Sequence, residues 1–147
     1  MEQNITVKTS TWFLTTVAYE KTMENGMEKR VKETYVVNAF SFTDAEKSIF
    51  NNMGHNDIEV TDITKAPFGE IFFTDNEKAD KFYKVKANFI TLDENTGKEK
   101  KSLVYYLVQA TSTKDAQHNF DDVMSRSMTD YSIEAIIETK VLDVFIA

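Results

Sequence analysis

The chain changes its hydrophobic period twice. In residues 12–21 and 82–92, apolar side chains fall at every second position, which is typical of β-strands. Farther along, apolar residues recur at intervals of four in two places, so each place carries one apolar helical stripe. The pattern therefore predicts strands followed by a helix, twice. The stripes are Ala45, Ile49 and Met53 in the first place, and Ala116, Phe120 and Met124 in the second.

The two places also share their residues. Residues 35–45 read YVVNAFSFTDA, and residues 106–116 read YLVQATSTKDA. Similarities on both sides of these segments fall in the same order, which indicates an internal duplication. We predict a first repeat over about 8–74 and a second over about 80–147, joined by 75–80 within a single domain, 1–147.

Each repeat predicts the order β-β-α-β(-β). Asn25-Gly26 and Thr96-Gly97 are typical of the turn of a β-hairpin. Third strands are expected at 58–64 and 132–139, followed by 68–74 and 141–146, which either bend or restart as new strands.

The helices should begin at the shared segments. Ser41 or Thr43 can cap the first helix, and Gly54 with His55 and Asn56 ends it. The second helix is expected to run to about Ser127.

A helix with one apolar stripe must bury that stripe, and a sheet is the available surface. We therefore expect an α+β fold in which an antiparallel-rich sheet carries two packed helices, related by a pseudo-two-fold axis. The pattern leaves open whether the two copies join side by side or face each other.

The amino-acid composition and the absence of known motifs exclude several classes of functional site. The chain has 147 residues, a net charge of −7 and no cysteine, so thiol chemistry and cysteine metal sites are excluded. His55 is expected in a turn and His118 on a helix surface. The chain has no G-x-S-x-G or phosphate-binding glycine motif, so we expect no enzyme activity, cofactor or metal. It shows no secretory signal or membrane-length apolar run, so we expect a cytoplasmic protein without a membrane partner.

An apolar face of the first hairpin is the candidate protein interface. It lies opposite Tyr35, Val37 and Ala39, and it either packs internally or forms a homo-oligomer. The candidate interface residues are Trp12, Leu14, Phe40 and Phe42.

Clustered basic residues offer an alternative. Aromatic and lysine side chains on one strand face are the ingredients of a platform for single-stranded nucleic acid. Glutamates lie among the basic residues of both hairpins, and this favours ordinary charged hairpin arms. The candidate contacts are Phe82, Lys84 and Lys86 on a strand, and Lys29, Arg30, Lys32, Lys98, Lys100 and Lys101 on the two hairpins.

Several segments resemble a known family. They include YEKTMENG (19–26), IEVTDI (58–63), EIFF (70–73), YLVQA (106–110) and ETKVLDVF (138–145), and the resemblance runs from about Trp12 to Phe145. The chain is similar to domain-of-unknown-function family 4494, small uncharacterised cytoplasmic proteins of gut anaerobes, their mobile elements and phages. The resemblance brings no established activity. It implies an accessory role, either in handling nucleic acid or in binding a host protein or signalling molecule to blunt defence.

These observations lead to three functional expectations. The first is a non-enzymatic phage or mobile-element accessory protein that acts through protein–protein binding and self-association. The first alternative is a single-stranded nucleic-acid-binding accessory protein. The second alternative is a protein that sequesters a small ligand or nucleotide between its two repeats.

Overall fold

The computed structural model describes residues 4–54 and 57–147. These residues contain two α-helices and nine β-strands, and the strands form two sheets. His55 and Asn56, expected near the end of the first helix, lie outside the described residues. In chain order the elements are β1 (Ile5–Thr9), β2 (Trp12–Thr22), β3 (Glu28–Asn38), α1 (Phe42–Met53), β4 (Glu59–Lys65), β5 (Phe68–Thr74), β6 (Lys81–Leu92), β7 (Glu99–Ala110), α2 (Thr113–Met124), β8 (Asp130–Glu138) and β9 (Val141–Phe145).

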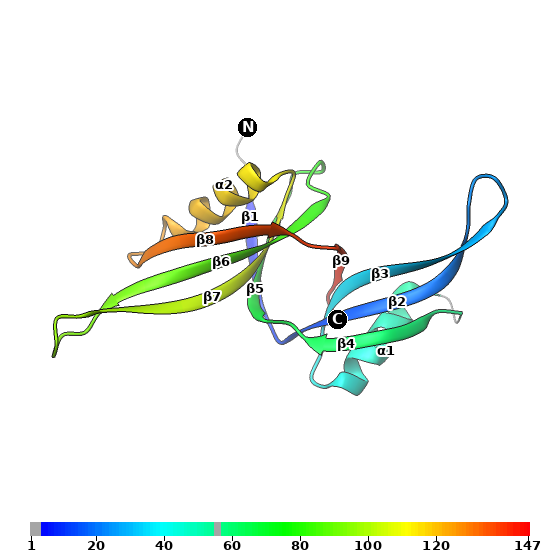
Figure 1. Cartoon of the computed structure of the whole chain (residues 1–147), viewed down its shortest axis with the longest axis horizontal. Coiled ribbons are helices and arrows are strands. Elements are labelled where there is room, and N and C mark those ends of the chain that lie inside the picture. Colours follow the sequence, from blue (N-terminus) through cyan, green and yellow to red (C-terminus); the bar gives the residue numbers. More distant parts are fainter. Residues whose placement is uncertain (1–3, 55–56) are drawn as a thin grey trace. The chain divides into compact units, whose positions relative to one another are not determined.

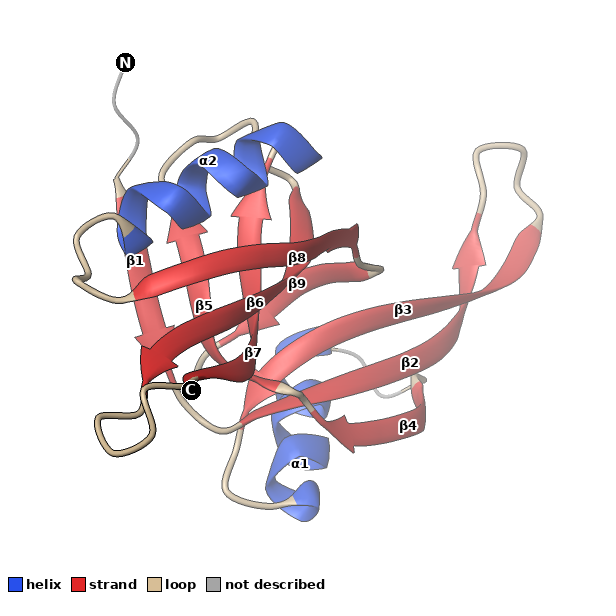
Figure 2. Cartoon of the chain, turned by 60° about the vertical axis from the view of Figure 1, so that its left-hand side comes forward, coloured by secondary structure: helices blue, strands red, loops and turns tan. Residues whose placement is uncertain are grey.

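The chain divides into two compact units, each with its own sheet and helix (Figures 1 and 2). In one unit, Ser10–Ala66 and Lys140–Ala147 form a sheet of order β4-β2-β3-β9, on which α1 packs. In the other, the chain up to Thr9 and Pro67–Thr139 form a sheet of order β1-β5-β7-β6-β8, on which α2 packs. The α+β class and the mostly antiparallel pairing are confirmed. The expectation of one sheet carrying both helices is wrong, because each helix has a separate sheet.

Two strands leave the repeat to which they belong in sequence. β5 pairs in parallel with β7, and β9 pairs in parallel with β3. The last strand of each repeat is therefore added to the second strand of the other repeat. The segments that could bend or restart do restart, and the spatial units do not coincide with the sequence repeats. The single domain and the pseudo-two-fold axis stay predictions.

The pairing irregularities support the duplication hypothesis. The β2–β4 register shifts between Thr16 and Val17, and the β6–β8 register shifts between Lys86 and Ala87, which are equivalent positions in the two repeats. The exchanged strands also have matching shifts, before Tyr35 on β3 and before Tyr106 on β7. Bulges are specific features of a strand pair, so equivalent bulges in both halves fit two copies of one unit.

The shared segments are strand-to-helix junctions with equivalent caps. Ser41 Oγ accepts a hydrogen bond from the backbone N–H of Asp44 at 3.1 Å, and Ser112 Oγ accepts one from Asp115 at 3.1 Å. Each aspartate then accepts a backbone N–H from the residue before the serine. Ser41, and not Thr43, is the N-cap residue of the first helix.

The helix ends differ because their residues differ. α1 ends at Gly54, whose φ of 73° is a left-handed conformation that glycine adopts easily, as predicted. α2 ends at Met124, earlier than the predicted Ser127. No glycine follows it, and the N–H of Ser127 instead bonds to the carbonyl of Met124 in a turn. The apolar stripes face the sheets as expected, and Ala45, Ile49, Ala116 and Phe120 are fully buried.

Candidate interaction surfaces

The two long hairpins extend beyond the rest of their sheets (Figure 1). β2 and β3 pair from Trp12 and Asn38 out to Thr22 and Glu28, whereas β4 pairs only with residues 13–18 of β2. The tips are therefore two-stranded arms, as the turn residues predicted.

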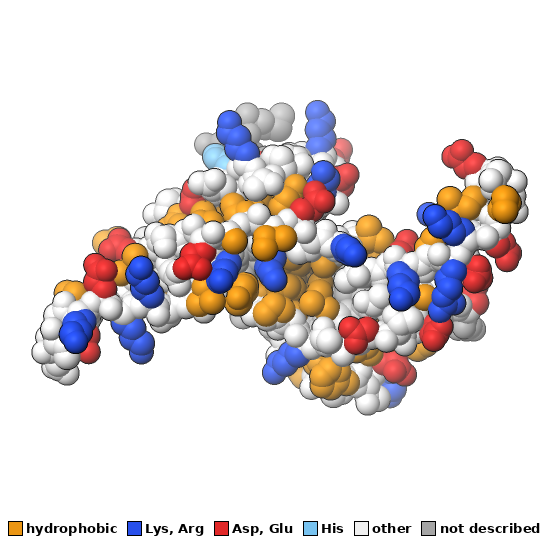
Figure 3. All heavy atoms as spheres, viewed as in Figure 1, with side chains coloured by type: hydrophobic (Ala, Val, Ile, Leu, Met, Phe, Trp, Pro, Cys, Tyr) orange, Lys and Arg blue, Asp and Glu red, His pale blue; other side chains and the backbone are white. Residues whose placement is uncertain are grey.

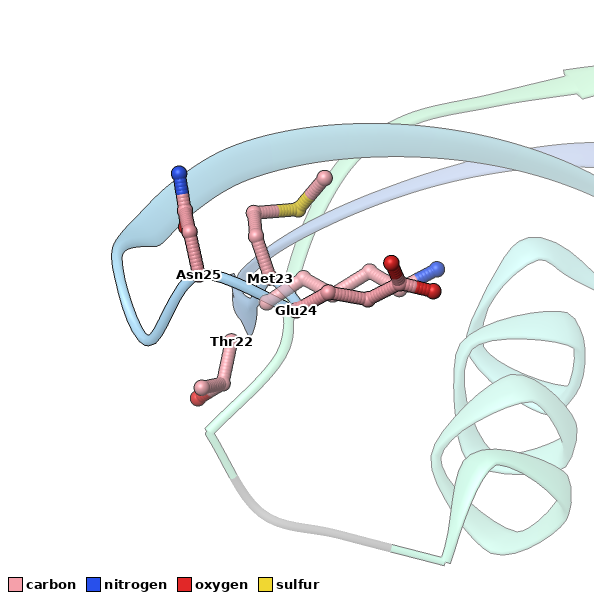
Figure 4. Close-up of a pocket in the computed structure, with 5 residues that line it drawn as sticks. Thr22, Met23, Glu24 and Asn25 are labelled. Atoms are coloured by element: carbon pink, nitrogen blue, oxygen red, sulfur yellow. The ribbon is translucent and has the colours of Figure 1, made fainter.

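A hollow of about 510 Å³ lies at the tip of the β2–β3 arm. Its labelled side chains diverge in Figure 4: Met23 and Asn25 extend to one side, Thr22 to the opposite side and Glu24 to a third. Asn25 Oδ1 accepts the backbone N–H of Met27 and so holds the turn. The polar side chains that line the hollow do not converge on a common point. The hollow therefore reflects the shape of the turn and is not a ligand site.

A second hollow, of about 530 Å³, lies on the face of β2 and β3 that points away from α1. Lys32, Thr34 and Lys140 line it together with Leu142 of β9. No buried side-chain nitrogen or oxygen among the described residues lacks a hydrogen-bond partner, so no such atom is left over to hold a ligand there. Two exposed lysines are its cationic groups.

The predicted protein interface separates into buried and exposed residues. Trp12 is only 1% exposed, and Leu14 is half-buried. Phe40 is fully exposed, and Phe42 is 55% exposed although its ring contacts Phe13 edge-on at 5.1 Å. Of the four candidates, Phe40 and Phe42 therefore offer most of the accessible apolar surface.

Phe50 adds to this surface, and the sequence patterns did not single it out. It lies two turns after Phe42 on α1 and is 37% exposed. We call Phe40, Phe42 and Phe50 the aromatic patch. Hydrophobic side chains reach the surface over the start of α1 in Figure 3. Comparing the repeats position by position along the helix could have found Phe50.

The second repeat has no equivalent patch. Thr111, Thr113 and Asp121 stand at the positions of Phe40, Phe42 and Phe50. Thr111 Oγ1 donates to Asp115 Oδ2 at 3.1 Å, and Asp121 Oδ1 accepts from the hydroxyl of Tyr131 at 2.6 Å. The same junction therefore folds with polar residues at all three positions.

The candidate nucleic-acid platform loses its aromatic member. Phe82 is only 3% exposed, so it cannot stack on a base. Lys84 and Lys86 do share a face of β6, with Lys101 of β7 on the same side. Lys84 Nζ lies 5.5 Å from the centre of the Tyr105 ring, and Lys86 forms an ion pair with Glu134 at 3.5 Å. Both lysines already have partners.

The remaining basic candidates lie on the two arms. All are exposed, but alternation along β3 and β7 directs Lys29 and Lys100 to the faces opposite Arg30 and Lys101. Arg30 also forms an ion pair with Glu59 at 2.5 Å. Within each arm the cations are thus divided between two faces. The other arm residues are Lys32 and Lys98.

Two tyrosines illustrate the electrostatics of the units. Burial and the nearby carboxylates of Glu33 and Asp143 raise the pKa of Tyr35, whose hydroxyl donates to Glu33 Oε1 at 3.0 Å. Burial and the charge of Glu70 raise the pKa of the equivalent Tyr106 to about 12. Each exchanged strand therefore brings a carboxylate close to the same tyrosine position.

Other site classes find no support in the described part of the chain. Within residues 4–54 and 57–147, no three histidine or acidic side chains gather closely enough to hold a metal ion. His118 is exposed on α2, and Asp122, four residues along the helix, accepts a hydrogen bond from Arg126 at 3.2 Å. No helix among these residues has the length and apolar character needed to cross a bilayer.

The comparisons with known proteins place the chain in one family. Residues 11–147 match the family model described as Domain of unknown function (DUF4494). No curated protein and no solved structure matches the chain. The predicted resemblance is confirmed, and the chain belongs to this family of unknown function.

Proposed function

Since membership of this family assigns no activity, we propose from its surface that the protein is a non-enzymatic phage or mobile-element accessory protein that binds proteins and self-associates. The observation that carries the proposal is the aromatic patch, where Phe40 is fully exposed and Phe42 and Phe50 are partly exposed. The setting is the cytoplasm of a bacterium or of a phage-infected host, where such a protein counters host defence by occupying a host protein.

The fold itself does not require these phenylalanines. Thr111, Thr113 and Asp121 occupy the equivalent positions of the second repeat, where the same serine and aspartate cap the helix. A fully exposed phenylalanine at Phe40 gains nothing from the core. Phe42 and Phe50 lie on α1, and Phe40 lies two residues before it. Exposed aromatic residues are typical of protein interfaces, where their burial supplies much of the binding energy.

The size of the patch indicates weak self-association. Burying a phenylalanine side chain contributes about 1.5–3 kcal/mol. Association must also overcome about 4–15 kcal/mol of lost translational and rotational freedom. Two patches packed together exceed that cost by only a few kcal/mol, so we expect a weak dimer with a dissociation constant on the order of millimolar.

Phe40→Thr tests the proposal, because it installs the residue that the second repeat carries at the same position. We expect sedimentation velocity to show concentration-dependent dimerisation of the natural protein and at least tenfold weaker dimerisation of F40T. Folding should be unchanged, because Phe40 is fully exposed. The matched control is Met128→Thr, at a fully exposed apolar residue outside the patch, which should leave dimerisation unchanged. A natural protein that stays monomeric up to about 1 mM would contradict self-association.

The alternatives have weaker support. For single-stranded nucleic acid, Phe82 is buried and Lys86 is paired with Glu134, which leaves exposed arm lysines in an acidic protein. For a small ligand, the hollow beside Lys32 and Lys140 offers two cations and no buried polar group without a partner. Salt-dependent polarisation of labelled single-stranded DNA or RNA, or a thermal shift with nucleotides, would favour them over protein binding.

A further inference from the structure

The two sheets differ at one edge. In the five-stranded sheet, β1 lies against the outer side of β5 in antiparallel pairing, from Ile5 opposite Thr74 to Thr9 opposite Glu70. In the four-stranded sheet, β9 holds the position equivalent to β5 and is the last strand. Within the described residues no strand pairs with β9 on the side away from β3. One exchanged strand is therefore covered along its edge, and the other is open.

The registers define which residues correspond. Glu70 pairs with Tyr106, and Asp143 pairs with Tyr35. Since the two tyrosines are equivalent in the repeats, Asp143 corresponds to Glu70, and Phe145 corresponds to Phe72.

Burial differs between these corresponding residues. Phe72 is 1% exposed, with Val7 of β1 directly opposite it and Ile5 packed on the same core cluster. Phe145 is only half-buried, although it stacks on Tyr35 at 5.1 Å. Leu142 and Ile146 are 52% and 49% exposed. Phe145 and Ile146 thus present apolar surface at positions whose counterparts in the other sheet, Phe72 and Phe73, pair with β1.

The edge is also acidic on the face of the sheet that carries α1. Glu33 and Asp143 both lie on that face next to Tyr35, and both carboxylates act on its hydroxyl. Asp143 Oδ1 accepts the backbone N–H of Val144 at 2.8 Å, so a side chain satisfies this strand donor. Neither carboxylate has an ion pair with a described lysine or arginine.

We propose that the β9 edge binds an extended segment of a partner protein, added antiparallel to β9 as β1 is added to β5. The segment places an apolar side chain beside Phe145 and a lysine or arginine opposite Asp143. Backbone hydrogen bonds hold the strand, and these two side chains select it. The inference rests on the proposed function as a protein-binding protein, but it uses a surface other than the aromatic patch.

A partner segment fits this edge better than a second copy of the chain. If two copies paired β9 with β9 over the whole strand, Asp143 at its centre would lie opposite Asp143 of the other copy. Like charges directly opposite each other destabilise antiparallel pairs, whereas a cation there is favourable. The chain as a whole carries a net charge of −7, so a basic segment is also attracted at longer range.

The strand β1, which covers the equivalent edge of β5, provides a peptide probe for the β9 edge. Residues 4–10 of this chain, made as a capped and labelled peptide, contain the strand that occupies the equivalent edge. Thr9 lies opposite Glu70, so Thr9→Lys in the peptide places a cation opposite Asp143, and Thr9→Glu places an anion there. We expect the lysine peptide to bind the full protein at least tenfold more tightly than the glutamate peptide at low salt. The amide NMR signals of β9 should shift on binding.

Two variants of the protein sharpen the test. Asp143→Lys changes an exposed side chain and should reverse the preference between the two peptides. Val144→Pro places a proline ring in the edge strand and removes the N–H that Asp143 Oδ1 accepts, so it should abolish binding of both. If Val144→Pro unfolds the four-stranded sheet, the reversal by Asp143→Lys still decides the question.

Other results would overturn the proposal. Equal binding of the two peptides, shifts confined to β4 or β8, or no binding at millimolar peptide would each do so. Dimerisation of the free protein that Val144→Pro abolishes would assign the edge to a second copy instead. F40T serves as the cross-control, because it should weaken self-association and leave peptide binding intact, so failure of either proposal is visible separately.

Discussion

Tyr106 lies in the core beneath α2, with ring centroids 5.4 Å from Phe72 and 5.1 Å from Phe120. Burial, and then the charge of Glu70, raise its pKa to about 12, compared with about 10 for an unfolded tyrosine. The folded state therefore holds this proton more tightly than the unfolded state. The stabilisation that comes from the raised pKa of Tyr106 is fully present below about pH 10 and is lost as the pH rises from about 10 to 12.

We predict that Tyr106→Phe flattens the alkaline fall in stability. Urea unfolding between about pH 9 and 12 should show a smaller decrease in the free energy of unfolding for this variant than for the natural protein. Phe120→Leu is the control, because it alters the same core without removing a titrating group and should shift the whole profile equally. Parallel profiles for Tyr106→Phe and the natural protein would contradict the assignment.

Single residues also show what strand patterns can and cannot predict. Alternation correctly assigned Trp12 and Phe82 to the face opposite the helix. It could not show that both are almost completely buried, because the period of a strand specifies a face and not what covers it. Phe40 and Phe42 could be identified from sequence since they differ from Thr111 and Thr113 within a shared junction. Phe50 required the same comparison to be extended to Asp121.

At the scale of the element, the two helices begin with equivalent serine N-caps, so the same substitution can be compared at two sites in one chain. Ser41 and Ser112 accept equivalent hydrogen bonds of 3.1 Å, and each lies one residue before its helix. We predict that Ser41→Ala and Ser112→Ala each lower the free energy of unfolding by about 1 kcal/mol. Chemical denaturation measures both. Glycine at the same positions should cost only a few tenths of a kcal/mol, and equal losses for alanine and glycine would contradict a capping role.

The strands were predicted unevenly. The hairpins, helices and third strands follow from local patterns, and their positions agree with the structure to within a few residues. β1 was not predicted, since Ile5 and Val7 alone give too short an alternation. The destinations of β5 and β9 are not a local property. Their apolar residues indicate burial, but choosing between the two sheets depends on packing that no periodicity records.

At the scale of the molecule, the exchange makes each unit depend on a strand from a distant part of the sequence. We predict that removing Lys140–Ala147 exposes the edge of β3 and loosens Ser10–Ala66 more than Pro67–Thr139. Hydrogen exchange should show β3 and α1 losing protection while β6 and β7 keep theirs. Leu142→Ala, at an exposed β9 residue, is the control and should leave protection unchanged. Equal loss in both units would show that they unfold as one.

The exchange of β5 and β9 also orders events on the ribosome. The residues that build β2, β3, α1 and β4 emerge early, but their sheet must wait for Val141–Phe145 before its fourth strand is present. At roughly 5–20 residues per second, that interval lasts several seconds. During this interval the edge of β3 has no partner strand. β5 cannot fill it in the final fold, because β5 pairs with β7, which is synthesised later. A chaperone that shields strand edges would find this chain a client during synthesis, before any partner meets the finished protein.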